Sequence, residues 1–584
     1  MKFTEILKRN RELSTQFTGN EYKIALLSNI TMGQLKEVLE LTLREEGINA
    51  NVVVGGYDSI VQDSSLFSET KAALVFWEAC NLIDGFHNSS FSMSAEDLSF
   101  LAERVEGEID LILNNLKDTP LVLINYFSSA LFHMDILRNG PLSNLCKRLN
   151  STLDRKVGPN QICVNLDVAL AKVGLGSSVD FRQFQSTKAL YTINFFKVYS
   201  ELVKPAFMAA TGRAKKILVL DCDNTLWGGI IGEDSYSGIQ MSDETLKGKV
   251  FQEVQTILRG LKREGVLLAL CSKNNLSDIN EVLSKHPDMV LKNNDFAAKK
   301  INWKDKATNL RELAIELNLG LDSFLFVDDS AFEIGLIQRE LPQVKCVQVP
   351  QNLSEYPSIM RELKQNFFNL SRTGEDALRT EMYLQEQQRK DQAFRFKSVE
   401  DYLASLDLKI KILCDMQIPV SRAAQMTQKT NQFNLTTRRY TEADILRMVN
   451  DSHYMLVVFS VEDRYGDYGA TGMIIVRQDS NTPGNALIDS FLMSCRIIGR
   501  NIEYKIFDEV VQILWTRGIN YLRAEYLRTE KNSQVELFYD HIGFNLVMEN
   551  KQHRIYGLNL AEYRPKNIRY IEVKLSATCE SVQK

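Results

Sequence analysis

Residues 217–225 read Ile217-Leu218-Val219-Leu220-Asp221-Cys222-Asp223-Asn224-Thr225, so a short apolar run ends in two carboxylates one residue apart. Such a run is typical of a buried strand in a parallel sheet, and open α/β folds place ligands at the carboxyl ends of these strands. Two neighbouring carboxylates repel one another unless a cation offsets their charge. Mg²⁺ prefers oxygen ligands and bridges to phosphate. The stretch therefore predicts a Mg²⁺ site for phosphoryl chemistry at Asp221 and Asp223, with one carboxylate free to attack phosphorus.

The chain has 584 residues, which is too long for one hydrophobic core. Typical domain sizes therefore predict about three to four domains. The hydrophobic fraction of 44% and the charged fraction of 24% are those of an ordinary soluble protein. A net charge of −5 argues against general nucleic-acid binding, because that requires a basic surface to displace counterions. We therefore expect no nucleic-acid partner.

The sequence carries no sign of export or of membrane insertion. Residues 1–10 contain no apolar core that could serve as a signal peptide, and no apolar stretch is long enough to cross a bilayer. The nine cysteines are scattered without paired spacing, which favours reduced thiols. The six histidines stand apart from one another and from cysteine pairs, so no zinc site is indicated. We expect a cytoplasmic enzyme with no membrane partner.

Strand-like and helix-like segments alternate from residue 22 onwards. This alternation predicts a parallel sheet covered by helices, in a first α/β domain over residues 1–210. The expected strands are 23–27, 51–54, 72–77, 121–126 and 161–166, and the expected helices are 31–46, 95–116 and 188–210.

A second α/β domain is expected over 211–360, with helices at 242–263 and 276–284 and further strands at 266–271, 300–302 and 324–327. Ser242 is the expected cap of the first of these helices. Ser272 ends one strand, and its hydroxyl can donate to a phosphoryl oxygen. Lys306 opens a helix after the next strand, and the last strand ends in the acidic pair Asp328 and Asp329. Four strand ends with Asp/Asp, Ser, Lys and Asp/Asp in this order favour one site over coincidence.

These residues resemble the motifs of the haloacid dehalogenase (HAD) superfamily of phosphotransferases, and segment 220–234 resembles its FkbH-like branch. The resemblance covers nearly the whole chain. It implies that Asp221 is the phosphoryl nucleophile and that Asp223 is the general acid/base. The implied phosphate-binding residues are Thr225, Ser272 and Lys306. The implied Mg²⁺ ligands are Asp221, the backbone carbonyl of Asp223, Asp328 and Asp329.

The spacing of the second domain leaves no room for an inserted cap domain. Only 46 positions lead from Thr225 to Cys271, and a helix occupies much of that stretch. The path from Ser272 to Lys306 is similarly short. The sequence therefore predicts a capless, Rossmann-like HAD domain with an open site. Such a site suits a substrate that is attached to a carrier or held by a neighbouring domain.

Residues 361–398 are polar, charged and compatible with a helix, and we expect a linker or bracing helix there. Successive strands without helices follow, and then a strand leads into a helix. This order predicts an antiparallel α+β domain over 399–584. The expected strands are 408–413, 454–461, 469–477 and 486–495, and the expected helices are 421–433, 441–449 and one that ends at 515.

The segment Arg496-Ile497-Ile498-Gly499-Arg500-Asn501 resembles the phosphate loop of the GNAT acyltransferase fold, in which backbone amides at a helix start cradle a pyrophosphate. Arg496 and Gly499 match that pattern, whereas Asn501 replaces its final small residue. The resemblance implies that Arg496, Gly499 and Arg500 contact a phosphate of CoA or of a phosphopantetheine arm. A basic helix start without a ligand is the alternative. Segment 429–436 also resembles the carboxyl domain of FkbH-like proteins.

The amino-terminal domain is expected to be similar to SGNH hydrolases, with Ser28 and Asn29 after the first strand, where a nucleophilic serine would lie. The sequence lacks Gly-Asp-Ser at this point and Asp-x-x-His near the end of the domain. A serine without a base is a poor nucleophile, so we expect Ser28 to be a turn or cap residue. The domain is interpreted as a recognition or structural module.

Cys222 has two interpretations. A glyceryl transferase gains from an enzyme thiol that accepts the acyl group first, and glyceryl-transferring relatives are thought to use such a cysteine. Alternate residues of a strand face opposite ways, so Cys222 can instead point into the core. Buried cysteines are common apolar fillers, and Cys271 can have the same role. Cys222 is thus either a catalytic nucleophile or a core residue.

The resemblance implies a Mg²⁺-dependent phosphatase/acyltransferase that dephosphorylates 1,3-bisphosphoglycerate and loads the glyceryl group onto the phosphopantetheine thiol of an acyl carrier protein. One alternative is a HAD phosphatase acting on a free phosphometabolite, with a separate GNAT acyl transfer in polysaccharide or secondary-metabolite biosynthesis. Another alternative is a docking scaffold for a carrier protein. Paired carboxylates repel one another and are unfavourable to keep unused, which argues against the scaffold.

Overall fold

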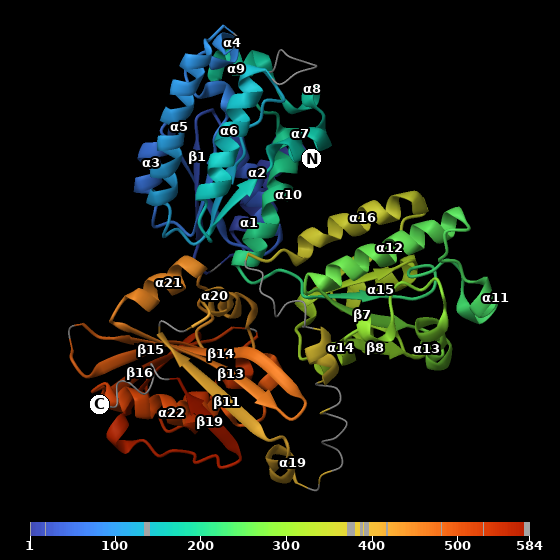
Figure 1. Ribbon diagram of the computed structural model, residues 1–584, viewed down its shortest axis with the longest axis vertical. Coiled ribbons are helices and arrows are strands. Elements are labelled where there is room, and N and C mark those ends of the chain that lie inside the picture. Colours follow the sequence, from blue (N-terminus) through green and yellow to red (C-terminus); the bar gives the residue numbers. More distant parts are fainter. Residues whose placement is uncertain are drawn as a thin grey trace. The chain divides into compact units, whose positions relative to one another are not determined.

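The computed structural model describes residues 2–17, 19–90, 92–132, 140–370, 380–385, 389, 396, 398–415, 418–480, 482–529 and 531–576. The chain divides into two compact units, Met1–Thr211 with Tyr440–Asp444, and Gly212–Arg439 with Ile445–Lys584. The described residues form one sheet in the first unit and two in the second (Figure 1). Among these residues, no helix is both long and apolar enough to span a membrane.

The first unit contains a five-stranded parallel sheet between two layers of helices. Its strands, in spatial order, are β2 (Ala50–Tyr57), β1 (Tyr22–Ser28), β3 (Ala72–Phe76), β4 (Val122–Asn125) and β5 (Gln161–Val164). One face is covered by α3 (Ile60–Leu66), α5 (Ala95–Asn115) and α6 (Pro141–Lys156). The α/β class expected for this part is confirmed, whereas its likeness to SGNH hydrolases stays a prediction.

Residues that alternate along a strand supply the two faces of this sheet. Val75 of β3 packs on the face with α5, while its neighbour Phe76 contacts the rings of Phe195 and Tyr199 in α10 (Ile193–Ala210). On that second face, α10 packs against α2 (Gly33–Glu45) and α7 (Leu166–Val173). The remaining helices are α1 (Phe3–Ser14), α4 (Phe86–Ser89), α8 (Leu175–Ser178) and α9 (Phe181–Thr187).

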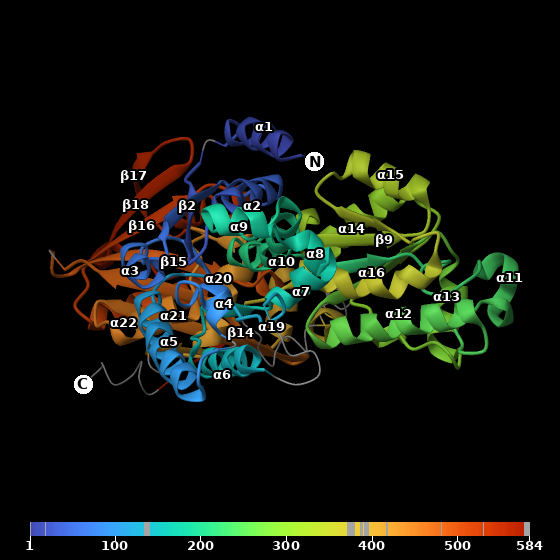
Figure 2. The same ribbon diagram turned by 90° about the horizontal axis from the view of Figure 1, so that it is seen from above.

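The second unit begins with another parallel sheet of five strands. Figure 2 shows helices on both faces of this sheet. In spatial order they are β10 (Lys345–Gln348), β9 (Phe324–Asp328), β6 (Ile217–Leu220), β7 (Leu267–Ser272) and β8 (Ala298–Ile301). One face packs on α12 (Leu246–Arg263), α13 (Leu276–Lys285) and α16 (Tyr356–Leu363), and the other packs on α14 (Lys306–Leu317) and α15 (Ala331–Glu340). Residues 221–266 contain only α11 (Ile231–Gly238) and α12, so no domain is inserted between β6 and β7.

The carboxyl-terminal part forms a nine-stranded mixed sheet. Its strands are β17 (Asn545–Glu549), β18 (His553–Asn559), β16 (Tyr521–Leu527), β15 (Asn485–Met493), β14 (Gly466–Gln478), β13 (Tyr454–Asp463), β11 (Leu408–Cys414) and β19 (Ile571–Leu575), with β12 (Phe433–Asn434) on β15. Its helices are α19 (Val399–Ser405), α20 (Val420–Lys429), α21 (Glu442–Asn450), α22 (Ile502–Thr516) and α23 (Phe538–His541). Two pairs, β15 with β16 and β11 with β19, are parallel, which corrects the purely antiparallel expectation.

Three expected helix boundaries were wrong. The helix expected over 188–210 begins at Ile193, after the cap Thr192. The cap of α12 is Thr245, whose hydroxyl accepts the Gly248 N–H at 2.9 Å, and not Ser242. Ser242 and Thr245 both carry a hydroxyl that can cap a helix, so the sequence alone did not distinguish them. Thr245 has the extended backbone that a cap requires. The helix expected over 421–433 ends at Lys429, because Phe433 and Asn434 pair with β15 instead.

The expected linker over 361–398 lies largely outside the described residues, and the division of the chain into four domains stays a prediction. Arg389, which is described, is fully buried. Its guanidinium forms an ion pair with Asp463 of β13 at 2.8 Å, so the segment is attached to the carboxyl-terminal sheet at this point.

The Thr245 cap can be tested by Thr245→Ala. The variant should lose about 1 kcal/mol of local stability in the first turn of α12, because the Gly248 N–H loses its acceptor. Native-state hydrogen exchange of the α12 amides measures this loss. Ser242→Ala is the matched control and should change protection by less than about 0.5 kcal/mol. Equal losses in the two variants would contradict the cap assignment.

Candidate active site

The carboxyl edge of the second parallel sheet gathers three carboxylates. Asp221 follows β6, and Asp328 and Asp329 lie at the end of the neighbouring strand β9. One oxygen of each residue lies within 4.8 Å of the others. Because β6 and β9 are parallel neighbours in register, their carboxyl ends meet at one place. Three carboxylate donors with no nitrogen or sulfur form a set that fits a hard cation such as Mg²⁺.

Lys306 compensates the charge of this cluster. Its ammonium lies 2.9 Å from Asp221 Oδ1 and 2.6 Å from Asp328 Oδ2, and the side chain is almost fully buried. Asp305 caps α14 by accepting the Thr308 N–H at 2.7 Å, which fixes the helix start that carries Lys306. Lys306, at the position expected from the sequence, therefore lies next to both acidic strand ends.

Burial and mutual repulsion shape the titration of the site. Burial raises the pKa of Asp328 to about 6, although Lys306 opposes the shift and Asp221 adds to it. Burial followed by the nearby Asp221 raises the pKa of Asp329 above its ordinary value. Burial of Lys306 would lower its pKa, but Asp221 and Asp328 raise it above the ordinary value, so the lysine stays charged. Asp328 and Asp329 thus bind protons more readily than isolated carboxylates do.

The carboxylate of Asp223 points to different partners. Its Oδ1 accepts the indole N–H of Trp227 and the backbone N–H of Ile231, both at 3.0 Å, and its Oδ2 accepts Asn274 Nδ2 at 2.9 Å. Asn274 also donates to Ser272 Oγ at 3.0 Å. Sequence reasoning gave no role to Trp227 or Asn274, although both lie inside the segments that it singled out. The signal in the sequence that could have identified them was their closeness to the predicted site residues.

Two hydroxyls complete the surroundings. Ser272 is buried at the end of β7, the strand that pairs with β6. Thr225 is fully buried, and its hydroxyl has no hydrogen-bond partner among the described residues. A buried hydroxyl without a partner is unfavourable in the absence of a ligand. This hydroxyl therefore suits an added acceptor such as a phosphoryl oxygen.

Cys222 lies between Asp221 and Asp223 in sequence and is buried. It is fully buried in the apolar cluster that contains Leu220 and Trp227. Burial, followed by the charge of Asp221, raises the pKa of its thiol well above the ordinary value. Burial disfavours a thiolate, yet Thr225 and Ser272 are buried to the same degree, so both interpretations of Cys222 stay predictions. Cys271 is also fully buried, and its thiol donates to the Lys306 carbonyl at 3.9 Å.

In the first unit, Ser28 makes a local turn contact. Its hydroxyl accepts the backbone N–H of Ile30 at 3.2 Å, as expected for a turn residue. Asn29 binds the following loop, donating to the carbonyls of Glu78 and Asn81 at 2.9 Å each. These contacts support the structural interpretation of both residues.

The residues predicted to bind CoA have different surroundings, and their contact with a phosphate stays a prediction: Arg496 donates to Ser494 Oγ at 3.2 Å. Arg500 is buried, contacts the Tyr468 hydroxyl and lies 3.5 Å from Asp463, so its guanidinium serves an internal network. Asn501 caps α22 with a left-handed backbone, and its amide donates to the Tyr570 hydroxyl at 2.8 Å. Tyr570 in turn donates to the Arg500 carbonyl at 3.3 Å, so the Tyr570 side chain lies on the turn at the start of the helix. Gly499 has a φ of 82°, as a turn requires.

Segment 429–436, which had no assigned role, fills a gap between two strands. Strands β15 and β16 pair only over residues 485–488 and 521–524. Beyond that point Leu435 donates its N–H to the Phe491 carbonyl at 3.1 Å and accepts the Leu527 N–H at 2.8 Å. Asn532 Nδ2 donates to the Asn434 carbonyl at 2.9 Å. Residues of this segment therefore form the backbone hydrogen bonds that β15 and β16 would otherwise lack where they diverge.

Comparison with known proteins supports the fold of the chain. The chain matches no family model and no curated protein. Its structure is similar to the crystal structure of the N-terminal part of the protein BF1531 from Bacteroides fragilis, described as containing a phosphatase domain complexed with Mg. The TM-score is 0.57 at 24% identity, over 64% of this chain and 100% of that one.

Weaker matches fall among acetyltransferases. A putative acetyltransferase of the GNAT family from Desulfovibrio desulfuricans has a TM-score of 0.18 and 19% identity, over 20% of this chain and 81% of that one. The ribosomal-protein-S18-alanine N-acetyltransferase from Escherichia coli has a TM-score of 0.21 and 13% identity, over 27% of this chain and 98% of that one. TM-scores this low establish no shared fold.

Mg²⁺ binding should depend on pH through Asp328. A raised pKa means that this carboxyl binds a proton at mildly acidic pH, and the proton competes with the metal. Mg²⁺ affinity should therefore fall about tenfold between pH 7 and pH 5, as measured by calorimetric titration. Asp328→Asn should abolish binding at both pH values, whereas the control Asp243→Asn, at an exposed aspartate, should bind like the unaltered protein. Equal affinity at the two pH values would contradict the assignment.

Proposed function

We propose that this chain is a Mg²⁺-dependent phosphohydrolase whose reaction takes place at Asp221. The observation that carries the proposal is the meeting of three carboxylates, the buried Lys306 and the unpartnered Thr225 hydroxyl at one sheet edge. Phosphoryl transfer requires acidic groups that coordinate a cation, a fixed positive charge and hydrogen-bond donors for the phosphoryl oxygens.

In the proposed reaction, Asp221 attacks phosphorus while the bond to the leaving oxygen breaks, which gives an aspartyl phosphate. Asp223 gives a proton to the leaving oxygen and then takes one from the water that releases phosphate. Trp227, Asn274 and the Ile231 N–H hold the Asp223 carboxylate in a fixed orientation for both steps.

The remaining residues stabilise charge. Thr225 and Ser272 donate hydrogen bonds to phosphoryl oxygens, and Lys306 contributes its positive charge. A bound Mg²⁺ would be held by Asp221, the Asp223 carbonyl and the carboxylates of Asp328 and Asp329, and would offset the charges of the carboxylates and phosphate.

The finer proposal concerns the substrate and the acceptor. The resemblance to FkbH-like proteins supports 1,3-bisphosphoglycerate as substrate and the phosphopantetheine thiol of an acyl carrier protein as acceptor of the glyceryl group. In this proposal the carrier thiol attacks the C1 carbonyl carbon and displaces the acyl phosphate as inorganic phosphate, whereas Asp221 attacks the phosphorus of the 3-phosphate and frees the 3-hydroxyl. The absence of an inserted domain between β6 and β7 supports a substrate held by a large partner. Because Cys222 is buried, this proposal includes no enzyme thioester at that residue.

Two alternatives predict different products. A phosphatase for a free phosphometabolite would release phosphate without a carrier. A docking scaffold would bind a carrier and release no phosphate. The buried set of compensated charges favours a working site over the scaffold, since burying ionised groups is unfavourable unless a function maintains them.

Asp221→Asn should lower phosphate release from acyl or monoester phosphates by at least about a thousandfold, because an amide oxygen does not replace the nucleophile. Thr225→Val keeps the shape and removes the hydroxyl, so it should lower the rate about tenfold to a hundredfold. Asp243→Asn, on an exposed aspartate of the same domain, is the control and should leave the rate unchanged. Release by Asp221→Asn at the unaltered rate would overturn the nucleophile assignment.

Carrier loading can be tested by incubating the full chain with 1,3-bisphosphoglycerate, Mg²⁺ and a carrier protein, with or without its phosphopantetheine group. The proposal predicts a glyceryl mass increase only on the carrier that bears the thiol. Cys222→Ala should load the carrier as well as the unaltered chain does, since the proposal includes no thioester at this residue. Phosphate release without any carrier product would favour the free-metabolite alternative, and no release at all would favour the scaffold.

A further inference from the structure

An ion pair connects two strand ends at the carboxyl edge of the second parallel sheet. Lys273 Nζ lies 2.6 Å from Glu333 Oε1. Lys273 directly follows β7, and Glu333 lies in the first turn of α15, which begins just after β9. Strand β6, which leads to Asp221, lies between these two strands. Because neighbouring strands are about 4.8 Å apart, the pair joins strand ends that are roughly 10 Å apart, on either side of Asp221.

The residues on both sides of Lys273 belong to the candidate active site. Ser272 precedes it and is the expected donor to a phosphoryl oxygen. Asn274 follows it and donates to Asp223 Oδ2 at 2.9 Å. Asn274 Nδ2 also donates to Ser272 Oγ at 3.0 Å. These contacts hold the backbone of Lys273 beside the place where a phosphorylated substrate would react.

The start of α15 leaves the Glu333 carboxylate available. Glu333 is the third residue of the helix, a position from which a glutamate often bonds back to the N–H of the cap residue. Here the cap residue Ser330 donates its N–H to Asp328 Oδ1 at 2.9 Å, so Glu333 reaches Lys273 instead. Burial raises the pKa of the Cys271 thiol, and the charge of Glu333 raises it as well. Glu333 therefore lies close to the end of β7.

The pair leaves one acceptor and further donors unused. Glu333 is only 6% exposed, and its Oε2 atom has no hydrogen-bond partner among the described residues. The Lys273 ammonium has three N–H donors, of which Glu333 takes one, and the side chain is 35% exposed. A buried carboxylate oxygen without a donor is unfavourable, so the arrangement suits a ligand that brings one.

The chemistry of this pair matches a ligand that carries a donor next to an acceptor. The hydroxyl of an α-hydroxy acyl group can donate to Glu333 Oε2, while the acyl oxygen beside it accepts from Lys273 Nζ. An amine could also donate to Glu333, but as an ammonium it would place a second positive charge next to Lys273 and repel it. A hydroxyl therefore fits the pair better than an amine does.

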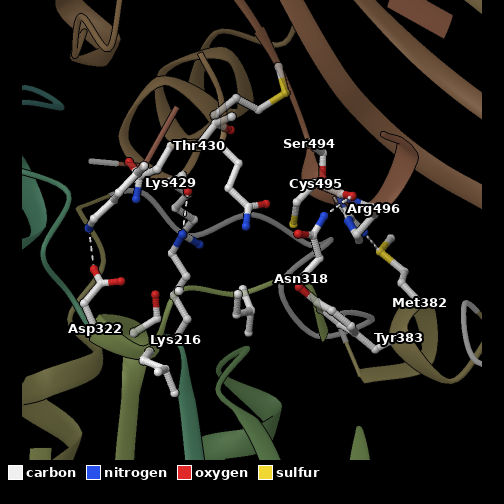
Figure 3. A pocket seen from close by; sticks show the side chains of 18 of the residues that line it. Lys216, Asn318, Asp322, Met382, Tyr383, Lys429, Thr430, Ser494, Cys495 and Arg496 are labelled. Atoms are coloured by element: carbon white, nitrogen blue, oxygen red, sulfur yellow. Dashed lines mark hydrogen bonds and ion pairs between the residues drawn. The ribbon is translucent and has the colours of Figure 1, made fainter. Parts of the chain in front are cut away.

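We propose that Lys273 and Glu333 determine the substrate specificity of the candidate active site by binding the α-hydroxy acyl part of a small phosphorylated hydroxy acid or of its acyl derivative. The inference rests on the phosphohydrolase proposed above, since the phosphoryl group of the same substrate would lie at Asp221. The cavity in Figure 3, which Lys216 and Asp322 line, lies at the amino edge of this sheet and has neither residue of the pair in its wall. The proposed contacts therefore belong to the carboxyl edge.

The test is calorimetric titration of the full-length protein in Mg²⁺ with phosphonates, whose carbon–phosphorus bond phosphatases of this kind do not hydrolyse. The ligand 2-hydroxy-4-phosphonobutanoate carries both groups that the pair would bind. The compound 4-phosphonobutanoate lacks the hydroxyl, 3-hydroxybutylphosphonate lacks the acyl oxygens, and 2-amino-4-phosphonobutanoate has an amine in place of the hydroxyl. The first ligand should bind about tenfold tighter than either compound that lacks a group, because each loses one hydrogen bond to a charged residue. It should also bind tighter than the amine.

Two variants separate the two contacts. Glu333→Leu should abolish the preference for the hydroxyl and keep the preference for the acyl oxygens. Lys273→Met should do the reverse, whereas Lys273→Arg keeps a charged donor and should keep both preferences. Lys285→Met, at an exposed lysine of α13, is the matched control and should bind all four compounds like the unaltered protein. A damaged fold would weaken all compounds together, so each affinity ratio reports its own contact.

The outcomes distinguish this inference from the proposed function. Equal affinity for the four phosphonates, or unchanged affinity ratios in Glu333→Leu and Lys273→Met, would overturn the inference and leave the phosphohydrolase proposal standing. Tightest binding of the amine would overturn the assignment of a hydroxy acid. Binding of none of the four would contradict both proposals, because the phosphonate group itself would then have no site.

Discussion

The buried ion pairs of Lys306 with Asp221 and Asp328 are the constraint on which the candidate active site depends. Three carboxylates at one sheet edge repel one another, and burial strengthens that repulsion by removing water. One ammonium placed between two of them makes the arrangement tolerable, and removing it would leave uncompensated buried charge. The start of α14 is therefore fixed as tightly as the strand ends, and the Asp305 cap provides that fixation.

Local patterns predicted much of this arrangement. The apolar run before Asp221, the apolar run before Asp328 and the start of α14 at Lys306 were visible in sequence, because strand ends and helix starts depend on neighbouring residues. Contacts with residues distant in sequence could not be predicted from these local patterns. Arg500 matched a phosphate loop by its neighbours, yet Asp463 and Tyr468 of other strands decide its position. Thr245 and not Ser242 is the cap of α12, and residue type could not separate them because both carry a hydroxyl.

The second parallel sheet carries opposite charges at the two ends of strand β6. Lys215 and Lys216 precede the strand, whereas Asp221 follows it and lies next to Asp328 and Asp329. The net charge of −5 for the whole chain conceals this separation, since opposite local charges largely cancel in the sum.

The segment that fills the gap between β15 and β16 affects how the chain is completed during synthesis. Leu435 donates to Phe491 and accepts from Leu527, and Leu527 leaves the ribosome 92 positions after Leu435. At typical elongation rates, that interval is on the order of ten seconds. During this time residues 433–435 lack strand β16, which forms the second set of backbone hydrogen bonds with them. The nascent chain thus exposes an unpaired strand edge during this interval, and a chaperone that covers this edge would prevent pairing with other chains.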